Sequence, residues 1–217
     1  LYFYKYVMLK STYFFVILIV DFNKVEKKMT PVYGYASTEK LHQIGLTDRN
    51  IVSFCQNGKL IKLKHGLYRS TNTFINNQNF IDVTQAMPYC VISRISALSF
   101  YELTTFIPQY TEVDIPLNYR RARILYPPVK INNADLYKFR KNVVKKRQGR
   151  YVFRIYDMEK TLCDCIKRRN SIGADVVREA LKTYLKHPNK NIDKLFKIAK
   201  KCKISLKFLS DWMTGML

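Results

Sequence analysis

The fold of the first third of the chain follows from residues 46–70, LTDRNIVSFCQNGKLIKLKHGLYRS. Thr47 suits the N-cap of a helix and Asn57-Gly58 suits its end, so we expect a helix over 47–57. The stretches KLIKL and GLYRS then alternate apolar and polar residues around His65-Gly66, which predicts two strands joined by a turn. Four apolar residues of the helix are expected to face inward: Ile51, Val52, Phe54 and Cys55.

The residues before this stretch predict two further helices. Residues 21–33 have a helical composition up to Pro31, and after a strand-like turn a short helix capped by Ser37 or Thr38 ends at Gly45. Helix, short helix, helix and hairpin is the order of a winged helix-turn-helix, whose helix after the turn enters the major groove of DNA. We therefore predict a winged helix-turn-helix domain over residues 21–75.

Polar and basic residues of this domain are candidates for DNA contact. Side chains at the front of the predicted recognition helix can face base edges, namely Thr47, Arg49, Asn50, Ser53 and Gln56. Side chains of the hairpin can contact phosphates, namely Lys62, Lys64, His65 and Arg69. Because the winged helix also serves as a dimerisation or bridging module, protein contact is the alternative interpretation.

The charge of the chain favours a polyanionic partner. It has 38 Lys and Arg against 16 Asp and Glu, a formal net charge of +22. Nucleic acid is the first candidate for such a partner, and an anionic membrane surface is the second. The five cysteines are scattered and lack the spacing of a zinc site, which indicates reduced thiols in a cytoplasmic protein. We predict no cofactor and no metal.

The first residues contain one strongly apolar run, STYFFVILIV at 11–20. A membrane span needs about 20 apolar residues, and no small-residue cleavage site follows Val20. We interpret residues 1–20 as an apolar N-terminal extension and expect no membrane partner.

A second domain is predicted over residues 76–217, after an Asn-rich junction at 71–80. Helices are expected near 80–87 and 94–104, and again in a helical C-terminal half at 157–169, 172–187, 191–202 and 204–216. Strands are expected in YCVIS, TEVDIPL, ILYPPVKI, NVVKKR and YVFRIY. The chain as a whole is therefore predicted to be α+β.

Four stretches of this domain carry a resemblance to a known family. They are ISRISAL at 92–98, YDMEKTLCD at 156–164, RNSIG at 169–173 and ALKTYL at 180–185, and they follow the Gly-Leu-Tyr of the hairpin at 66–68. In this order the chain resembles the AbiEi family of antitoxins from type IV toxin–antitoxin (abortive infection) systems, over roughly residues 24–215. Two features depart from that family: Met158 stands where Pro is expected, and the residues before Asp21 have no counterpart.

The resemblance implies a division of labour between the domains. The N-terminal domain would bind operator repeats in duplex DNA and repress its own operon, and the C-terminal domain would provide antitoxin activity. The toxin of such systems is a nucleotidyltransferase-like enzyme, which a type IV antitoxin can counter through a shared target such as RNA, without a stable complex. The alternative is a stand-alone winged-helix transcriptional regulator with a ligand-sensing or dimerisation domain.

A basic segment supplies candidates for the antitoxin surface. Residues 119–150 hold eleven basic side chains and one acid, Asp135, and they are interleaved with Tyr119, Tyr126, Tyr137, Phe139 and Tyr151. Together with the helix start at 157, this predicts an antitoxin surface of Arg120, Arg121, Arg123, Lys145, Lys146, Arg147, Arg150, Asp157, Glu159, Lys160 and Asp164. The alternatives are a basic edge that prevents strands from pairing, and polar residues that only cap and anchor a helix.

Catalysis has weak support in the sequence. Glu112 and Asp114, with the later Glu159-Lys160, loosely match the acids and lysine of a metal-dependent nuclease. The chain has no Gly-rich phosphate loop and no nucleophile elbow. We therefore predict that the protein is not an enzyme.

Overall fold

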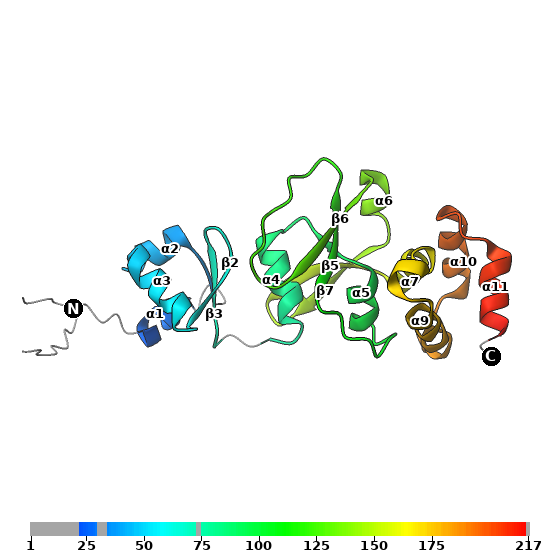
Figure 1. Cartoon of the computed structure of the whole chain (residues 1–217), viewed down its shortest axis with the longest axis horizontal. Helices are drawn as coiled ribbons and strands as arrows, with labels where there is room; N and C mark the ends of the chain where they lie inside the picture. Colours follow the sequence, from blue (N-terminus) through cyan, green and yellow to red (C-terminus); the bar gives the residue numbers. More distant parts are fainter. Residues whose placement is uncertain (1–21, 30–33, 73–74, 216–217) are drawn as a thin grey trace, which may run out of the picture. The chain divides into compact units, whose positions relative to one another are not determined.

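The computed structural model describes residues 22–29, 34–72 and 75–215 (Figure 1). The chain divides into two compact units, residues 1–74 and 75–217, and its mixture of helices and small sheets is α+β, as predicted. The predicted N-terminal extension lies outside the described residues. None of the helices in the described ranges has the length and apolar character needed to cross a membrane.

In its described residues, the first unit has a three-stranded antiparallel sheet and three helices. The sheet order is β1-β3-β2, so the hairpin pairs with a first strand that the sequence indicated only as a strand-like turn. Ser37 and Thr47 cap the second and third helices, as expected. The elements are α1 (Phe22–Met29), β1 (Tyr35–Ser37), α2 (Thr38–Gln43), α3 (Asp48–Gln56), β2 (Leu60–Lys64) and β3 (Leu67–Ser70).

The core of the first unit corrects one expectation about α3. Ile51 and Phe54 are buried among residues of α1, α2 and the sheet, and Cys55 packs at the edge of this core. Val52 is not part of it, because its side chain is 55% exposed. Successive helix residues are about 100° apart, so the buried face through Ile51, Phe54 and Cys55 leaves Val52 on the outer side.

The second unit begins with a five-stranded mixed sheet in the order β6-β5-β4-β8-β7. β4 and β5 are antiparallel, as are β7 and β8, whereas β4 is parallel to β8 and β5 is parallel to β6. All six residues of β5 are buried. The elements are α4 (Gln78–Ala86), β4 (Val91–Ile92), α5 (Arg94–Phe100), β5 (Thr111–Pro116), β6 (Val129–Ala134), α6 (Leu136–Arg140), β7 (Val143–Gln148) and β8 (Tyr151–Tyr156).

One predicted strand is shifted. We expected a strand over ILYPPVKI at 124–131, but β6 starts at Val129. Pro127 and Pro128 have no N–H group to donate to a ladder, so regular pairing begins after them.

Helices form the C-terminal half of the second unit, as predicted (Figure 1). The sequence predicted one helix over 172–187. In the structure, Gly173, with φ +111°, separates a four-residue helix from the long helix that starts at Ala174. A large apolar cluster is formed by the inner faces of these helices together with Leu98 and Leu103. The helices are α7 (Met158–Lys167), α8 (Arg169–Ile172), α9 (Ala174–Lys186), α10 (Ile192–Lys201) and α11 (Leu206–Thr214).

Candidate nucleic-acid interface

The start of α3 is held by a reciprocal pair of side chains. The Asn50 backbone N–H donates to Thr47 Oγ1 at 3.3 Å, while the Thr47 N–H and hydroxyl donate to Asn50 Oδ1 at 3.1 and 2.7 Å. This is a capping box, which satisfies two donors at the helix start. Thr47 and Asn50, both predicted to face base edges, therefore also fix where the helix begins.

The outer face of α3 is a short polar stripe with one apolar residue. Arg49, Val52 and Gln56 are exposed, and the spacing of three and four residues places them on one face. Ser53 is half-buried, and its Oγ accepts from the Asn57 side-chain amide at 3.3 Å. The face therefore offers a guanidinium, an amide and a branched apolar side chain.

An acid lies beside this face. Asp48 is exposed at the first position of α3, and its Oδ1 lies 2.9 Å from Nε2 of His42 on α2. A carboxylate there suits the positive end of the helix dipole. It also links α2 to α3 across the turn between them.

The hairpin presents its basic residues on different faces. Lys62 lies opposite Tyr68, with Nζ 5.8 Å from the ring centroid, and it is exposed. His65 is exposed at the turn, where Gly66 has φ +75°, a value that favours glycine. Lys64 is half-buried at the end of β2. These three side chains fit the predicted wing.

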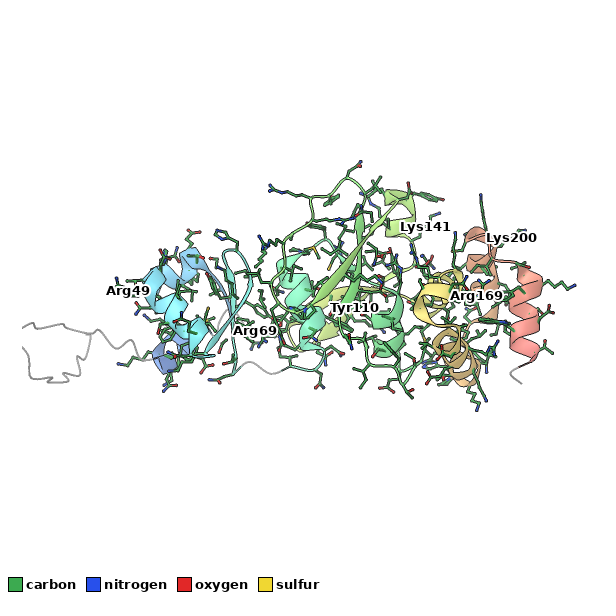
Figure 2. All side chains as sticks on the ribbon, viewed as in Figure 1. Arg49, Arg69, Tyr110, Lys141, Arg169 and Lys200 are labelled. Atoms are coloured by element: carbon green, nitrogen blue, oxygen red, sulfur yellow. The ribbon has the colours of Figure 1, made fainter. Side chains whose placement is uncertain are left out.

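Arg69 does not fit the predicted wing. It lies opposite Ile61 and Tyr35, so the strand register places it on the face of the sheet away from Lys62 and Tyr68. Its side chain is buried, and Nη1 donates to the Ser70 carbonyl at 3.0 Å. Figure 2 labels Arg69 at the hairpin and Arg49 on α3. We therefore withdraw Arg69 from the candidate phosphate contacts.

Strand directions in the second unit bring most of the predicted basic residues together. β4 runs antiparallel to β5 and parallel to β8, and β7 runs antiparallel to β8. The strands β4 and β8 therefore begin at the end of the sheet where β5 and β7 finish. The loop after β5 therefore starts at the same end of the sheet as the turn between β7 and β8. Lys145 lies in this part of the sheet, opposite Arg154. We call the six arginines beside it the arginine cluster: Arg120, Arg121, Arg123, Arg147, Arg150 and Arg154.

The segment before β4 contacts two residues of the arginine cluster, Arg120 and Arg154. The Tyr89 hydroxyl donates to the Arg120 carbonyl at 2.5 Å, and Arg154 Nη2 donates to the Pro88 carbonyl at 2.5 Å. Lys145 lies opposite Arg154 on β7 and is exposed. Sequence reasoning missed Arg154, although the alternation in YVFRIY places it on the same face of the sheet as the exposed Val152.

Two aromatic residues that were expected on this surface belong to the core. Phe139 and Tyr151 are buried, Phe139 against Val91 and Tyr156. Tyr119, Tyr126 and Tyr137 are exposed. Lys146 is half-buried, with Nζ 5.7 Å from the Tyr101 ring centroid.

The acidic part of the predicted antitoxin surface lies elsewhere. Asp157 follows the last residue of β8, and is therefore at the opposite end of the sheet from the arginine cluster. Its Oδ1 accepts from the Lys160 N–H at 2.9 Å, which confirms the predicted N-cap, and its Oδ2 lies 2.9 Å from Lys194 Nζ. Lys160 pairs with Asp164 one turn along α7, as predicted.

Glu159 is buried with partners on two helices. Its Oε1 accepts from the Tyr184 hydroxyl at 3.0 Å, and its Oε2 lies 3.0 Å from Lys194 Nζ. Burial alone would lower the pKa of Lys194, but its hydrogen bonds to Asp157 and Glu159 outweigh this effect and raise it. We therefore correct the expectation of a surface role for Asp157 and Glu159, because these two acids anchor the start of α7 to α9 and α10.

A small pocket opens beside this anchor. Its volume is about 280 Å³. It brings Lys146 close to Asp157 and Glu159, three residues that the sequence had assigned to one site, and adds Tyr101 and Lys194.

The acids on β5 are paired and buried. Glu112 Oε1 lies 3.1 Å from Lys130 Nζ, and Asp114 Oδ1 lies 3.0 Å from Arg94 Nη1 and accepts from the Ser93 hydroxyl at 3.0 Å. Burial raises the pKa of Asp114. In the part of the chain that the structure describes, no group of three or more His, Cys, Asp and Glu side chains could hold a metal ion.

The five cysteines are free thiols. Burial raises the pKa of Cys90 to about 12, so this thiol stays protonated at neutral pH. No protein-family model matches the chain, and no curated protein matches its sequence.

Proposed function

We propose that the chain is a DNA-binding transcriptional regulator whose first unit binds duplex DNA as a winged helix-turn-helix. One observation carries the proposal: a capped helix, α3, has an exposed polar stripe and packs against the strand β2 of a basic hairpin in the same compact unit. The order α1-β1-α2-α3-β2-β3 supports the same interpretation. The net charge of +22 supplies attraction to phosphate.

The residues of α3 have distinct roles in this proposal. Arg49 donates to guanine and Gln56 pairs with adenine, because these side chains match the base edges of the major groove. Val52 contacts the methyl group of thymine, which explains a branched apolar side chain on an otherwise polar face. Thr47 and Asn50 set the start of the helix, and Ser53 lies between the side chains that contact bases.

Phosphate contacts come from the hairpin. Lys62, Lys64 and His65 follow the DNA backbone beside the groove, and Arg69 is excluded from the set. These contacts fix the position of α3 without reading sequence.

The second part of the proposal is that the protein acts in the cytoplasm as the antitoxin of a type IV toxin–antitoxin system. It would repress its own operon from operator repeats and counter a nucleotidyltransferase-like toxin through the second unit. The support is the resemblance to the AbiEi family. In the structure, three of the four stretches contribute to the core of the second unit, for example through Leu98, Leu162 and Tyr184.

The second candidate function is a stand-alone regulator whose second unit senses a ligand. The observation that favours it is the pocket of about 280 Å³ beside Lys146, Asp157 and Glu159. Its volume is near the lower limit for small-molecule sites.

The DNA-binding proposal is tested with duplexes that the full chain selects from a random library. Arg49→Ala and Val52→Ala are expected to reduce the preference for the selected sequence, whereas Lys62→Ala with Lys64→Ala weakens binding to every duplex and reduces its salt dependence. Lys27→Ala, an exposed lysine on α1, is the matched control. Absence of duplex binding at low salt would refute the proposal.

A second experiment isolates the role of Val52. Replacing thymine by uracil in the selected duplex removes one methyl group per base and leaves hydrogen bonding intact. The wild-type chain is expected to lose affinity on the uracil duplex, and Val52→Ala is expected to bind both duplexes equally. If the wild type and Val52→Ala discriminate equally between the thymine and uracil duplexes, Val52 is not one of the residues that contact bases.

The antitoxin proposal needs a cellular test. The product of the neighbouring reading frame is induced with and without this chain, and growth is followed. Protection by the full chain that survives Arg49→Ala would place the antitoxin activity outside the DNA-binding helix. Failure to protect, or a neighbour unrelated to nucleotidyltransferases, favours the stand-alone regulator.

A further inference from the structure

The arginine cluster differs from the rest of the chain in composition. The chain has 25 lysines and 13 arginines, yet the cluster contains six arginines, with Lys145 as the neighbouring lysine. Five of the six are exposed, and Arg154 is half-buried. Arginine presents a planar fork of donors that binds phosphate in a bidentate manner and stacks on flat rings, which lysine cannot do. A general excess of lysine does not explain this grouping.

An aromatic pair lies beside Arg120, with Tyr89 half-buried and Tyr119 exposed. The rings of Tyr89 and Tyr119 are 4.9 Å apart between centroids, and Tyr119 is 48% exposed. Tyr119 immediately precedes Arg120, and its N–H donates to the Pro116 carbonyl at the end of β5. This hydrogen bond and the packing on Tyr89 hold the Tyr119 ring in place beside Arg120, at the start of the loop that carries Arg120, Arg121 and Arg123.

Among the described residues, Asp82 and Asp114 near this end are buried. Asp135 follows β6 and is exposed, and its Oδ1 accepts from the Tyr137 N–H at 3.0 Å. The carboxylates of Asp157 and Glu159 lie at the opposite end of the sheet, where Lys194 neutralises them in part. The arginine cluster therefore keeps a strong positive charge.

From these observations we propose that the arginine cluster and Tyr119 form a binding site for single-stranded nucleic acid. The guanidinium groups bind phosphates, and the Tyr119 ring stacks on an unpaired base. A duplex offers phosphates but hides the faces of its bases, so it cannot use the ring. The site extends the function proposed for the second unit by naming its ligand class, and it is separate from the duplex-binding surface of α3.

The test measures binding of the full chain to fluorescein-labelled single strands, 16-nucleotide oligo(U) and oligo(dT), and to a duplex of the same length. Tyr119→Ala is expected to weaken single-strand binding about tenfold and to leave duplex binding unchanged, because stacking of one base on an aromatic ring has an effect of this order. Tyr119→Phe keeps the ring and is expected to bind like the wild type. Phe106→Ala, 47% exposed in the segment before β5, is the matched control.

An abasic strand separates stacking from charge. An oligonucleotide with the same phosphates and no bases is expected to bind the wild-type chain about tenfold more weakly than oligo(dT), and to bind Tyr119→Ala with that same reduced affinity. Changing Arg120, Arg121 and Arg123 together to Gln is expected to flatten the salt dependence on both strands. A stronger response with oligo(U) than with oligo(dT) would identify RNA as the ligand, and the reverse would identify DNA.

Two outcomes overturn the inference: no single-strand binding at low salt, or equal effects of Tyr119→Ala on single strand and duplex. Both are distinct from failure of the proposed function. Loss of duplex binding by the Arg49 variant, with single-strand binding retained, supports two separate sites. Single-strand binding without any duplex binding refutes the winged-helix proposal and leaves this inference standing.

Discussion

The starts of α3 and α7 look alike in sequence but have opposite environments. Each begins with a capping side chain, Thr47 in α3 and Asp157 in α7, followed by charged residues in the first turn. Around α3 those residues are exposed, whereas Glu159 in α7 is 3% exposed. A polar helix start is therefore not by itself a surface for partners.

The difference arises from what packs on each helix. Lys194 of α10 and Tyr184 of α9 supply a countercharge and a donor to the acids of α7, so these acids can be buried without losing their partners. Buried charges of this kind cost stability when one partner is removed. Exposed charges such as Arg49 contribute little to stability and remain available for binding.

The largest difference in the stability lost on substitution is expected between Arg94 and Arg49. Arg94→Met leaves the buried Asp114 without its countercharge and should lower the free energy of unfolding of the second unit by about 3–5 kcal/mol. Arg49→Ala should change the free energy of unfolding of the first unit, followed by far-ultraviolet circular dichroism, by less than about 0.5 kcal/mol. Urea denaturation followed by fluorescence of the single tryptophan, Trp212, measures the second unit. A loss below about 1 kcal/mol for Arg94→Met would contradict the contrast.

The next effect concerns the first turns of the two helices. Glu159→Ala leaves the Tyr184 hydroxyl without its acceptor and should cost about 1–3 kcal/mol, while Asp48→Ala in α3 should stay within about 0.5 kcal/mol. The double variant with Tyr184→Phe should lose less than the sum of the single variants. Full additivity would show that the hydrogen bond contributes nothing.

The pH dependence of stability gives a signed test of buried charge. Because the folded pKa of Asp114 is raised above 3.8, the folded state keeps a proton that the unfolded state has lost, so the contribution of Asp114 to stability falls as pH rises through this window. Its slope cannot exceed about 1.4 kcal/mol per pH unit. Asp114→Asn should remove this contribution. The free energy of unfolding of the wild type and of Asp114→Asn is measured by urea denaturation over a series of pH values, and the contribution is the difference between the two series. A difference of the opposite sign would contradict the assignment.

The smallest expected difference in stability loss is between substitutions of the two N-cap residues, Asp157 and Thr47. Removing an N-cap side chain costs about 0.5–2 kcal/mol. Asp157→Ala should fall at the upper end, because Asp157 also accepts from Asn142 at 3.1 Å, and Thr47→Ala should fall at the lower end. Trp212 fluorescence reports the first variant and far-ultraviolet circular dichroism the second. Equal losses would mean that the added contacts of Asp157 are without energetic effect.

Local signals predicted most elements of both units. Caps at Ser37, Thr47 and Asp157 and the alternation around Gly66 depend on residues within one or two turns of each other. The errors fell where a side chain meets residues far away in the sequence. Val52 shows that apolar character does not establish burial, and Arg69 shows that a basic residue in a hairpin need not face solvent.

The sequence by itself determined the α+β class, the positions of the helices and hairpins, and the positive charge. Only the tertiary structure decided which of the predicted site residues share a surface. The order β6-β5-β4-β8-β7 brings arginines from positions 120 to 154 to one end of a sheet and places Asp157 at the other. Strand order depends on pairing between residues distant in the chain, and no local period of the sequence records it.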